Sequence, residues 1–152
     1  MRKPKALPLK TVFLKTLPVM AGYLVLGTGF GILFESKGYG FIWSLLMSTA
    51  VFAGSMQYVA IPLLTSGASL LTAALTTLVV NARHLFYGIS MIDIYRDSGK
   101  KKPYLIFGLT DETYSLVTQN QPPEGMGKAT YCFLVTAFNH VYWVCGCVLG
   151  NL

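Results

Sequence analysis

The side chains that could do chemistry in this sequence interrupt segments that are otherwise apolar. They are residue types that bind protons, ions or polar ligands: Gln57, Asn81, Arg83, His84, Asp111, Glu112, Asn139 and His140. Polar groups inside a membrane segment are costly, and where they occur they usually serve a function. Arg83 and His84 are the clearest pair, because they follow an uncharged run from Gly38 to Ala82. The alternative is that Arg83 lies at an ordinary helix end and extends its side chain to the lipid headgroups.

These residue types exclude some chemistries more firmly than they support others. The sequence contains neither the histidine and carboxylate spacing of a metal site nor a nucleotide-binding glycine loop. We therefore expect no metal, no cofactor and no direct coupling to ATP. An intramembrane hydrolase would need an activated nucleophile, and Ser55 with His84 or His140 fits that pattern. The signal is weak, because almost any serine in a membrane protein would satisfy it.

A membrane transporter accounts for more of the pattern. Arg83 could pair with a carboxylate of a substrate, and Asp111 or Glu112 could attract an ammonium group or carry a proton. His84 and His140 are further candidates for proton coupling, because imidazole is the side chain that ordinarily titrates closest to neutral pH. The alternative is a structural bridge between Arg83 and one of the two carboxylates. These two interpretations are compatible.

The composition defines the class of protein that must position these residues. The chain is 53% hydrophobic and 12% charged, with a mean hydropathy of +0.54, and its apolar residues occur in blocks. Blocks of roughly 20 residues predict membrane-spanning helices, whereas barrel strands would give segments of ~10 alternating residues. We therefore predict an all-α, polytopic membrane bundle. It would consist of a basic segment, residues 1–16, and one transmembrane domain, residues 17–152.

About five hydrophobic segments follow one another: 17–34, 41–64, 70–94, 103–117 and 129–152. The second is interrupted at its centre by Gly54 and Ser55 beside Gln57. Such a group can mark an unwound segment at the membrane midplane, although composition alone favours an unbroken helix. Small residues at helical spacing predict close packing of helices, and two pairs have this spacing: Gly27 with Gly31, and Gly146 with Gly150.

The positive charge is a topology signal. The net charge of +6 comes from basic residues beside apolar blocks, so we expect a lipid bilayer and no nucleic acid as the partner. The basic amino terminus and the second cluster, Arg96 to Lys102, should both face the cytoplasm. A simple count of three spans would place that cluster outside. Either residues 70–94 dip in and return, with a polar turn at Asn81 to His84, or residues 41–64 do so. No clear internal repeat helps to choose.

Three motifs, taken in order, resemble the AzlC-type permeases, the large subunits of bacterial branched-chain amino acid exporters. They are Phe52 to Gln57, Asn81 to Tyr87 and Leu109 to Glu112. The resemblance implies export of branched-chain amino acids across the bacterial cytoplasmic membrane and coupling to the proton gradient. It also implies a hetero-oligomer with a small hydrophobic AzlD-type subunit. Members of that family continue beyond the last block, so we expect this chain to be a C-terminally truncated form.

Our leading hypothesis is therefore a multi-pass transporter subunit that is not an enzyme. Its path would be formed by Gly54, Ser55, Gln57, Asn81, Arg83, Asp111 and Glu112. The proton would be carried by His84, His140, Asp111 or Glu112. The main alternative is a membrane scaffold that transports nothing and whose polar residues only hold helices together.

Overall fold

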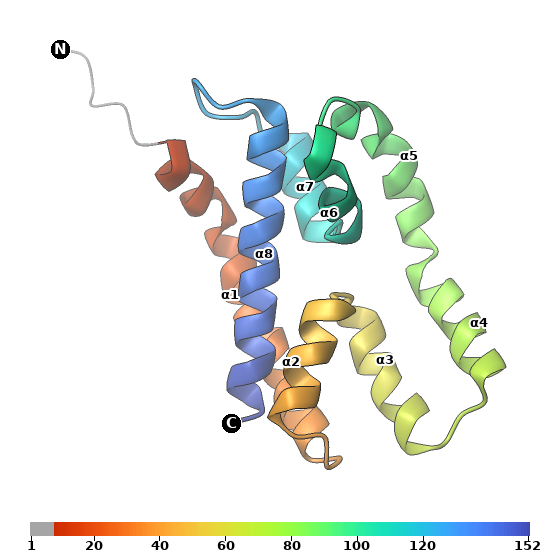
Figure 1. Cartoon of the computed structure of the whole chain (residues 1–152). Helices are drawn as coiled ribbons and strands as arrows, with labels where there is room; N and C mark the ends of the chain where they lie inside the picture. Colours follow the sequence, from red (N-terminus) through yellow and green to blue (C-terminus); the bar gives the residue numbers. More distant parts are fainter. Residues whose placement is uncertain (1–7) are drawn as a thin grey trace.

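The computed structural model describes residues 8–152, and every regular element in that range is a helix. The helices are α1 (Pro8–Glu35), α2 (Phe41–Ala50), α3 (Gly54–Thr65), α4 (Leu70–Asn81), α5 (Arg83–Tyr95), the 3-10 helix η1 (Gly99–Lys101), α6 (Lys102–Phe107), α7 (Asp111–Gln119) and α8 (Lys128–Gly150) (Figure 1). The all-α prediction is confirmed. Residues 1–7, the first part of the predicted basic segment, lie outside the described residues, and the division at residue 17 stays a prediction.

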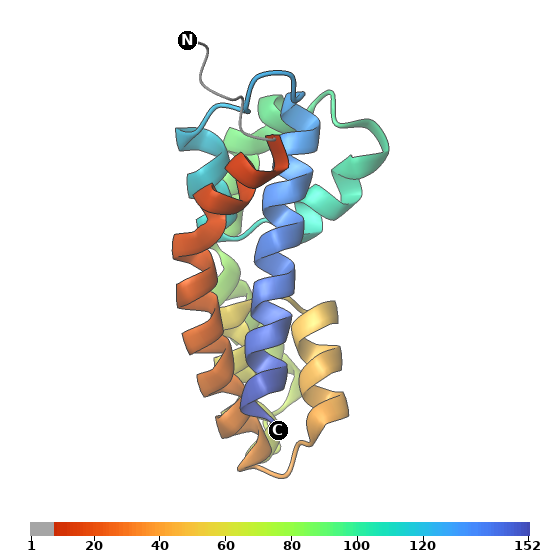
Figure 2. The same ribbon diagram turned by 90° about the vertical axis from the view of Figure 1, so that its left-hand side faces the viewer.

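Helices α1 and α8 form the long central pair and run side by side in the same direction (Figures 1 and 2). By length and composition, both could cross a membrane. They approach most closely where Gly27 meets Gly146 and Gly31 meets Gly150. A Cβ atom added at Gly146 would lie 2.7 Å from the backbone oxygen of Tyr23, so a larger residue would push the helices apart. The glycine pairs predicted to pack lie at this contact.

Two helical hairpins lie beside this pair and run only partway along it. The hairpin α2–α3 enters from the end where α1 finishes, and the hairpin α6–α7 enters from the opposite end (Figure 1). Helices α4 and α5 follow each other from one end of the bundle to the other, with a break at Ala82. The tips of the two hairpins, residues 51–53 and 108–110, therefore approach each other near mid-height.

This arrangement distinguishes the two chain paths left open by the charge pattern. Residues 41–64 form a hairpin that turns back within the bundle, whereas residues 70–94 run through its full length. The prediction of a re-entrant turn at Asn81 to His84 is therefore wrong, and so is the unbroken helix for residues 41–64. The physical reason is that α4 is only half of a longer element, which α5 continues beyond the break.

The hairpin tips have local causes in the sequence. Phe52 separates α2 from α3 and adopts a φ of 41°, a left-handed conformation that is uncommon for a residue other than glycine. Thr110 begins α7, because its side-chain oxygen accepts a hydrogen bond from the backbone N–H of Thr113. Gly108 precedes it, and a Cβ atom there would clash with the side chain of Thr136 on α8. Both tips thus close against α8.

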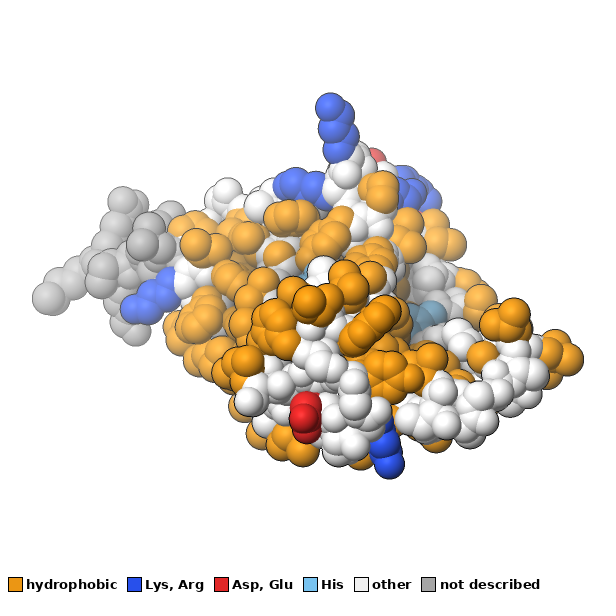
Figure 3. Space-filling view, turned by 60° about the horizontal axis from the view of Figure 1, so that its bottom comes forward, with side chains coloured by type: hydrophobic (Ala, Val, Ile, Leu, Met, Phe, Trp, Pro, Cys, Tyr) orange, Lys and Arg blue, Asp and Glu red, His pale blue; other side chains and the backbone are white. Residues whose placement is uncertain are grey.

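The outer surface of the bundle is apolar. Helix α4 has no buried residue, and Leu70, Leu78 and Val79 are 90%, 69% and 76% exposed. The space-filling view shows hydrophobic side chains over most of the face it presents, with lysine and arginine gathered at its edges (Figure 3). An apolar surface of this extent suits contact with lipid, because soluble proteins rarely expose so large an apolar patch to water.

Candidate functional site

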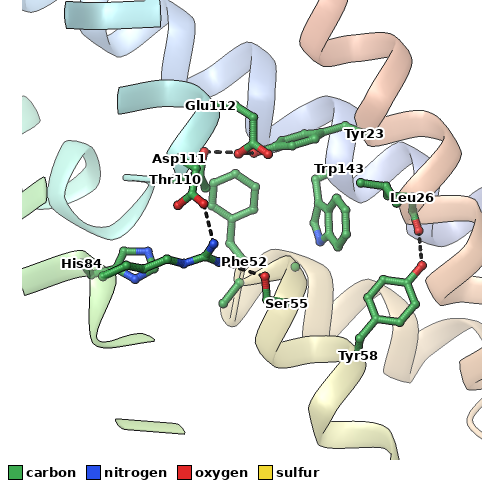
Figure 4. Close-up of a pocket in the computed structure, with 13 residues that line it drawn as sticks. Tyr23, Leu26, Phe52, Ser55, Tyr58, His84, Thr110, Asp111, Glu112 and Trp143 are labelled. Carbon is green, nitrogen blue, oxygen red and sulfur yellow. Dashed lines mark hydrogen bonds and ion pairs between the residues drawn. The ribbon is translucent and has the colours of Figure 1, made fainter. Parts of the chain in front are cut away.

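A pocket of about 260 Å³ lies where the two hairpin tips approach α1, α5 and α8. Its walls combine charged, hydroxyl and aromatic side chains with short stretches of backbone (Figure 4). The lining residues are Tyr23, Leu26, Phe52, Ala53, Gly54, Ser55, Tyr58, Arg83, His84, Thr110, Asp111, Glu112 and Trp143. The three sequence motifs thus meet at one site, although they are far apart along the chain.

Arg83 is the centre of the polar side of this pocket. It is the first residue of α5, directly after the break that follows α4. Its guanidinium donates one hydrogen bond to the Asp111 carboxylate, with which it forms an ion pair, and another to the Ser55 hydroxyl at 2.8 Å. Ser55 and Asp111 belong to the first turns of α3 and α7, so a single cation joins the beginnings of two half-length helices (Figure 4).

Glu112 occupies a different environment from its neighbour Asp111. The Tyr23 hydroxyl of α1 lies 2.7 Å from the Glu112 carboxylate and 2.9 Å from the hydroxyl of Thr110. Both carboxylates lie in the first turn of α7, where negative charge complements the exposed N–H groups and the helix dipole. The pocket therefore holds one guanidinium and two carboxylates.

Aromatic side chains form the apolar side of the pocket. Trp143 is held in place because its indole N–H donates to the side-chain oxygen of Gln57 at 2.8 Å. Its ring passes within 3.0 Å of the position that a Cβ atom would take at Gly54. Gln57 itself is completely buried behind the tryptophan and does not line the pocket. In the structure it therefore supports Trp143, and its predicted place on the path stays a prediction.

Of the other candidate residues, His84 lines the pocket, whereas Asn81 and His140 do not. His84 lines the pocket, with its Nδ1 atom 3.2 Å from the backbone oxygen of Asn81, whereas Asn81 is not among the lining residues. His140 lies behind Phe52, whose ring centroid is 4.3 Å away, and its Nδ1 atom is 3.1 Å from the Tyr104 hydroxyl. Of the two histidines, only His84 lines this pocket.

Several lining residues are absent from the sequence prediction. Tyr23, Leu26, Phe52 and Trp143 are apolar or aromatic residues within apolar segments, where their composition resembles that of any packing residue. Thr110 had a recognisable signal, because threonine before two acidic residues is a typical helix start. Among the described residues, no group of histidine, cysteine or acidic side chains is arranged to hold a metal ion.

Taken together, the fold and the pocket define a class of protein. Helices that break inside an apolar bundle, with their ends gathered around a small polar pocket, are typical of secondary membrane transporters. In its architecture the chain thus resembles α-helical membrane transport proteins.

The sequence model of the AzlC protein family matches residues 18–152, and the chain belongs to this family. It is 46% identical over 143 residues to the branched-chain amino acid transport protein AzlC of Bacillus subtilis (strain 168), covering 94% of this chain and 56% of that protein. It is also 30% identical over 138 residues to the inner membrane protein YgaZ of Escherichia coli (strain K12), covering 89% of this chain and 56% of that protein. The resemblance predicted from the three motifs is confirmed.

The chain spans between half and two thirds of the length of these relatives. An uncharacterized membrane protein of Haemophilus influenzae, for example, is 40% identical over 144 residues that cover 94% of this chain and 59% of that protein. These relatives are named as transport or membrane proteins, which favours the transporter over the hydrolase alternative. No solved structure matches the chain.

Proposed function

We propose that the chain is a transporter subunit that exports branched-chain amino acids across the bacterial cytoplasmic membrane and binds them in the pocket around Arg83. The observation that carries this proposal is the combination of a guanidinium, two carboxylates and an aromatic wall within one pocket of a membrane bundle. The relative in Bacillus subtilis is named as a branched-chain amino acid transport protein, which supports the same substrate class.

The chemistry of the pocket suits a zwitterion with an apolar side chain. Arg83 would hold the substrate carboxylate, with help from the backbone N–H groups that begin α3. Asp111 would hold the ammonium group. The substrate would then replace the internal contact between Arg83 and Asp111 that the structure shows. Leu26, Phe52 and Trp143 would surround the branched side chain.

The same pocket limits how finely substrates can be distinguished. An apolar wall separates side chains that differ by one methylene group by only ~1–3 kcal/mol. Valine, leucine and isoleucine should therefore all enter, and methionine should also pass.

The arrangement of charge supports a multi-pass topology with the amino terminus in the cytoplasm. Lys10 at the start of α1 and Lys128 at the start of α8 lie at the same end of the bundle as the cluster from Arg96 to Lys102 (Figure 1). Basic residues favour the cytoplasmic side. In this orientation α6–α7 enters from the cytoplasm and α2–α3 enters from outside.

We infer that export is coupled to the proton gradient and that the proton is carried by a residue of the pocket around Arg83.

A second subunit completes the proposal. The family resemblance implies a small, hydrophobic AzlD-type partner, and the exposed apolar surface of α4 and α5 offers room for either that subunit or lipid. Within residues 8–152, helix α4 packs mainly against its chain neighbours α3 and α5, and none of its residues is buried.

The test is a flux measurement in lipid vesicles that contain the chain, with and without the partner subunit. We expect vesicles with both subunits to exchange labelled leucine and valine faster than empty vesicles, while labelled glutamate is excluded because its second carboxylate would meet Asp111 and Glu112. If leucine exchange with both subunits present equals that of empty vesicles, the proposed function is wrong.

A further inference from the structure

The two neighbouring carboxylates of the pocket differ in how their charge is compensated. Asp111 forms an ion pair with Arg83. Glu112 accepts a hydrogen bond from Tyr23 at 2.7 Å, and within residues 8–152 it forms no ion pair. A carboxylate inside a membrane protein is costly without a cation, so Glu112 is the acid that a proton can neutralise without breaking an existing pair.

The titratable and charged groups around Glu112 come from α1, α3, α5 and α7. Arg83 and His84 face the pocket from α5, but the guanidinium is already bound to Asp111 and Ser55. Tyr23 approaches from α1, Tyr58 lines the pocket from α3, and α8 contributes Trp143, which does not titrate. Asp111 is adjacent in sequence, and its carboxylate forms the ion pair with Arg83.

The Tyr23 hydroxyl has one hydrogen and two acceptors within reach, Glu112 and Thr110. Its hydrogen can therefore change acceptor when Glu112 is protonated. When Glu112 is ionised, Tyr23 donates to its carboxylate. When Glu112 carries a proton, the new O–H bond donates to the Tyr23 oxygen, and the Tyr23 hydrogen turns to Thr110, whose oxygen is 2.9 Å away. Each state satisfies every group, and no other reactant is needed.

The response would reach the beginning of α7. Thr110 begins this helix by accepting from the backbone of Thr113, and its hydroxyl donates to the Thr113 hydroxyl at 3.1 Å. The Thr113 hydroxyl in turn accepts a hydrogen bond from Asn139 of α8 at 2.9 Å. A proton on Glu112 therefore alters contacts at the helix turn that also presents Asp111 to Arg83.

We propose that Glu112 takes up the coupling proton and that Tyr23 transmits its protonation state to the start of α7. The coupling role rests on the proposed transport function. The proton site itself is argued from the contacts among Glu112, Tyr23 and Thr110. This proposal singles out one residue among Asp111, Glu112, His84 and His140.

Infrared difference spectroscopy on the purified chain in lipid tests the proton site without any transport. As the pH falls, we expect a carbonyl band from a protonated carboxylic acid that is missing in Glu112→Gln and retained in Asp111→Asn. Tyr23→Phe should shift the band, because it removes the hydrogen-bond partner while leaving the carboxyl group in place. The proposal is overturned if the band survives in Glu112→Gln or is lost only in Asp111→Asn.

Flux measurements then test the coupling. Glutamine can neither take up nor release a proton, so the ratio of pH-driven accumulation to exchange of leucine should fall in Glu112→Gln vesicles relative to wild-type vesicles. Accumulation with the wild-type pH dependence in this variant would contradict the inference. If wild-type vesicles exchange no leucine, the proposed function fails, whereas the infrared titration still decides whether Glu112 binds the proton.

Discussion

Arg83 joins separate parts of the molecule through one side chain. It begins α5, and it binds the first turn of α3 through Ser55 and the first turn of α7 through Asp111. The two interpretations that the sequence left open, a bridge within the protein and a ligand for a substrate carboxylate, fit the same geometry. The structure shows the bridge, and under the proposed function a zwitterion would replace it.

The sequence anticipated the charged half of the site better than its apolar half. Ser55, Arg83, Asp111 and Glu112 stand out because such groups are rare in apolar segments, and the structure brings all four to one pocket. Trp143 could not be singled out, because an aromatic residue in an apolar helix looks the same whether it faces a neighbour or a cavity. The sequence also does not show whether a glutamine faces a cavity or a neighbour: Gln57 is buried behind Trp143, and its predicted place on the path stays a prediction.

At the residue scale, Gln57→Leu should destabilise the protein and loosen Trp143. Leucine removes the acceptor of the indole N–H, and a buried donor without a partner costs about 1–3 kcal/mol. Thermal unfolding in detergent would measure the loss. In a Trp43→Phe background the emission of Trp143 reports its surroundings directly. Unchanged emission together with unchanged thermal stability would show that the hydrogen bond does not hold the ring.

At the scale of elements, broken helices are the feature that composition hides. Residues 41–64 carry no charge, and apart from Gly54, Ser55 and Gln57 at their centre nothing distinguishes one long helix from two halves. The count of basic clusters nevertheless required one block to dip and return. It could not say which, because α4 looked too short to span a membrane until the structure showed that α5 extends it.

The chain path predicts that the loops before α4 and after α5 lie on opposite sides of the membrane. A thiol introduced by Ser66→Cys, between α3 and α4, should react with an impermeant reagent from one side of the membrane, and one introduced by Asp97→Cys, after α5, should react only from the other. The exposed native cysteine is first removed by Cys145→Ser. Reaction of both introduced thiols from the same side would restore the re-entrant path for residues 70–94.

The contact between α1 and α8 gives a second prediction at this scale. Gly146→Ala should destabilise the protein by about 1–3 kcal/mol, because the added methyl group meets the backbone of α1. Gly22→Ala is the matched control, since nothing lies within 4 Å of its added carbon. The control should be neutral or slightly stabilising, as alanine favours helix formation. Equal unfolding temperatures for the two variants would argue against close packing at Gly146.

At the scale of the whole molecule, two runs along the bundle are each followed by a hairpin that turns back near the middle. The first consists of α1 with α2–α3, and the second consists of α4 and α5 with α6–α7, in the opposite direction (Figure 1). The pocket lies where the hairpin tips meet. The sequence showed no internal repeat, because this likeness lies in the path of the backbone and not in the residues. A site at the meeting point of opposed half-helices suits a protein that opens to each side in turn.

The most direct test of the account asks whether leucine binds in this pocket through Arg83. In a Trp43→Phe background, Trp143 is the remaining tryptophan, and it lines the site. We predict that leucine changes its emission in a saturable way. Arg83→Ala should raise the half-saturating concentration ~10- to 150-fold, the equivalent of losing a charge-assisted hydrogen bond of about 1.5–3 kcal/mol. Superimposable titrations of the two proteins would contradict the assignment of this pocket as the amino acid site.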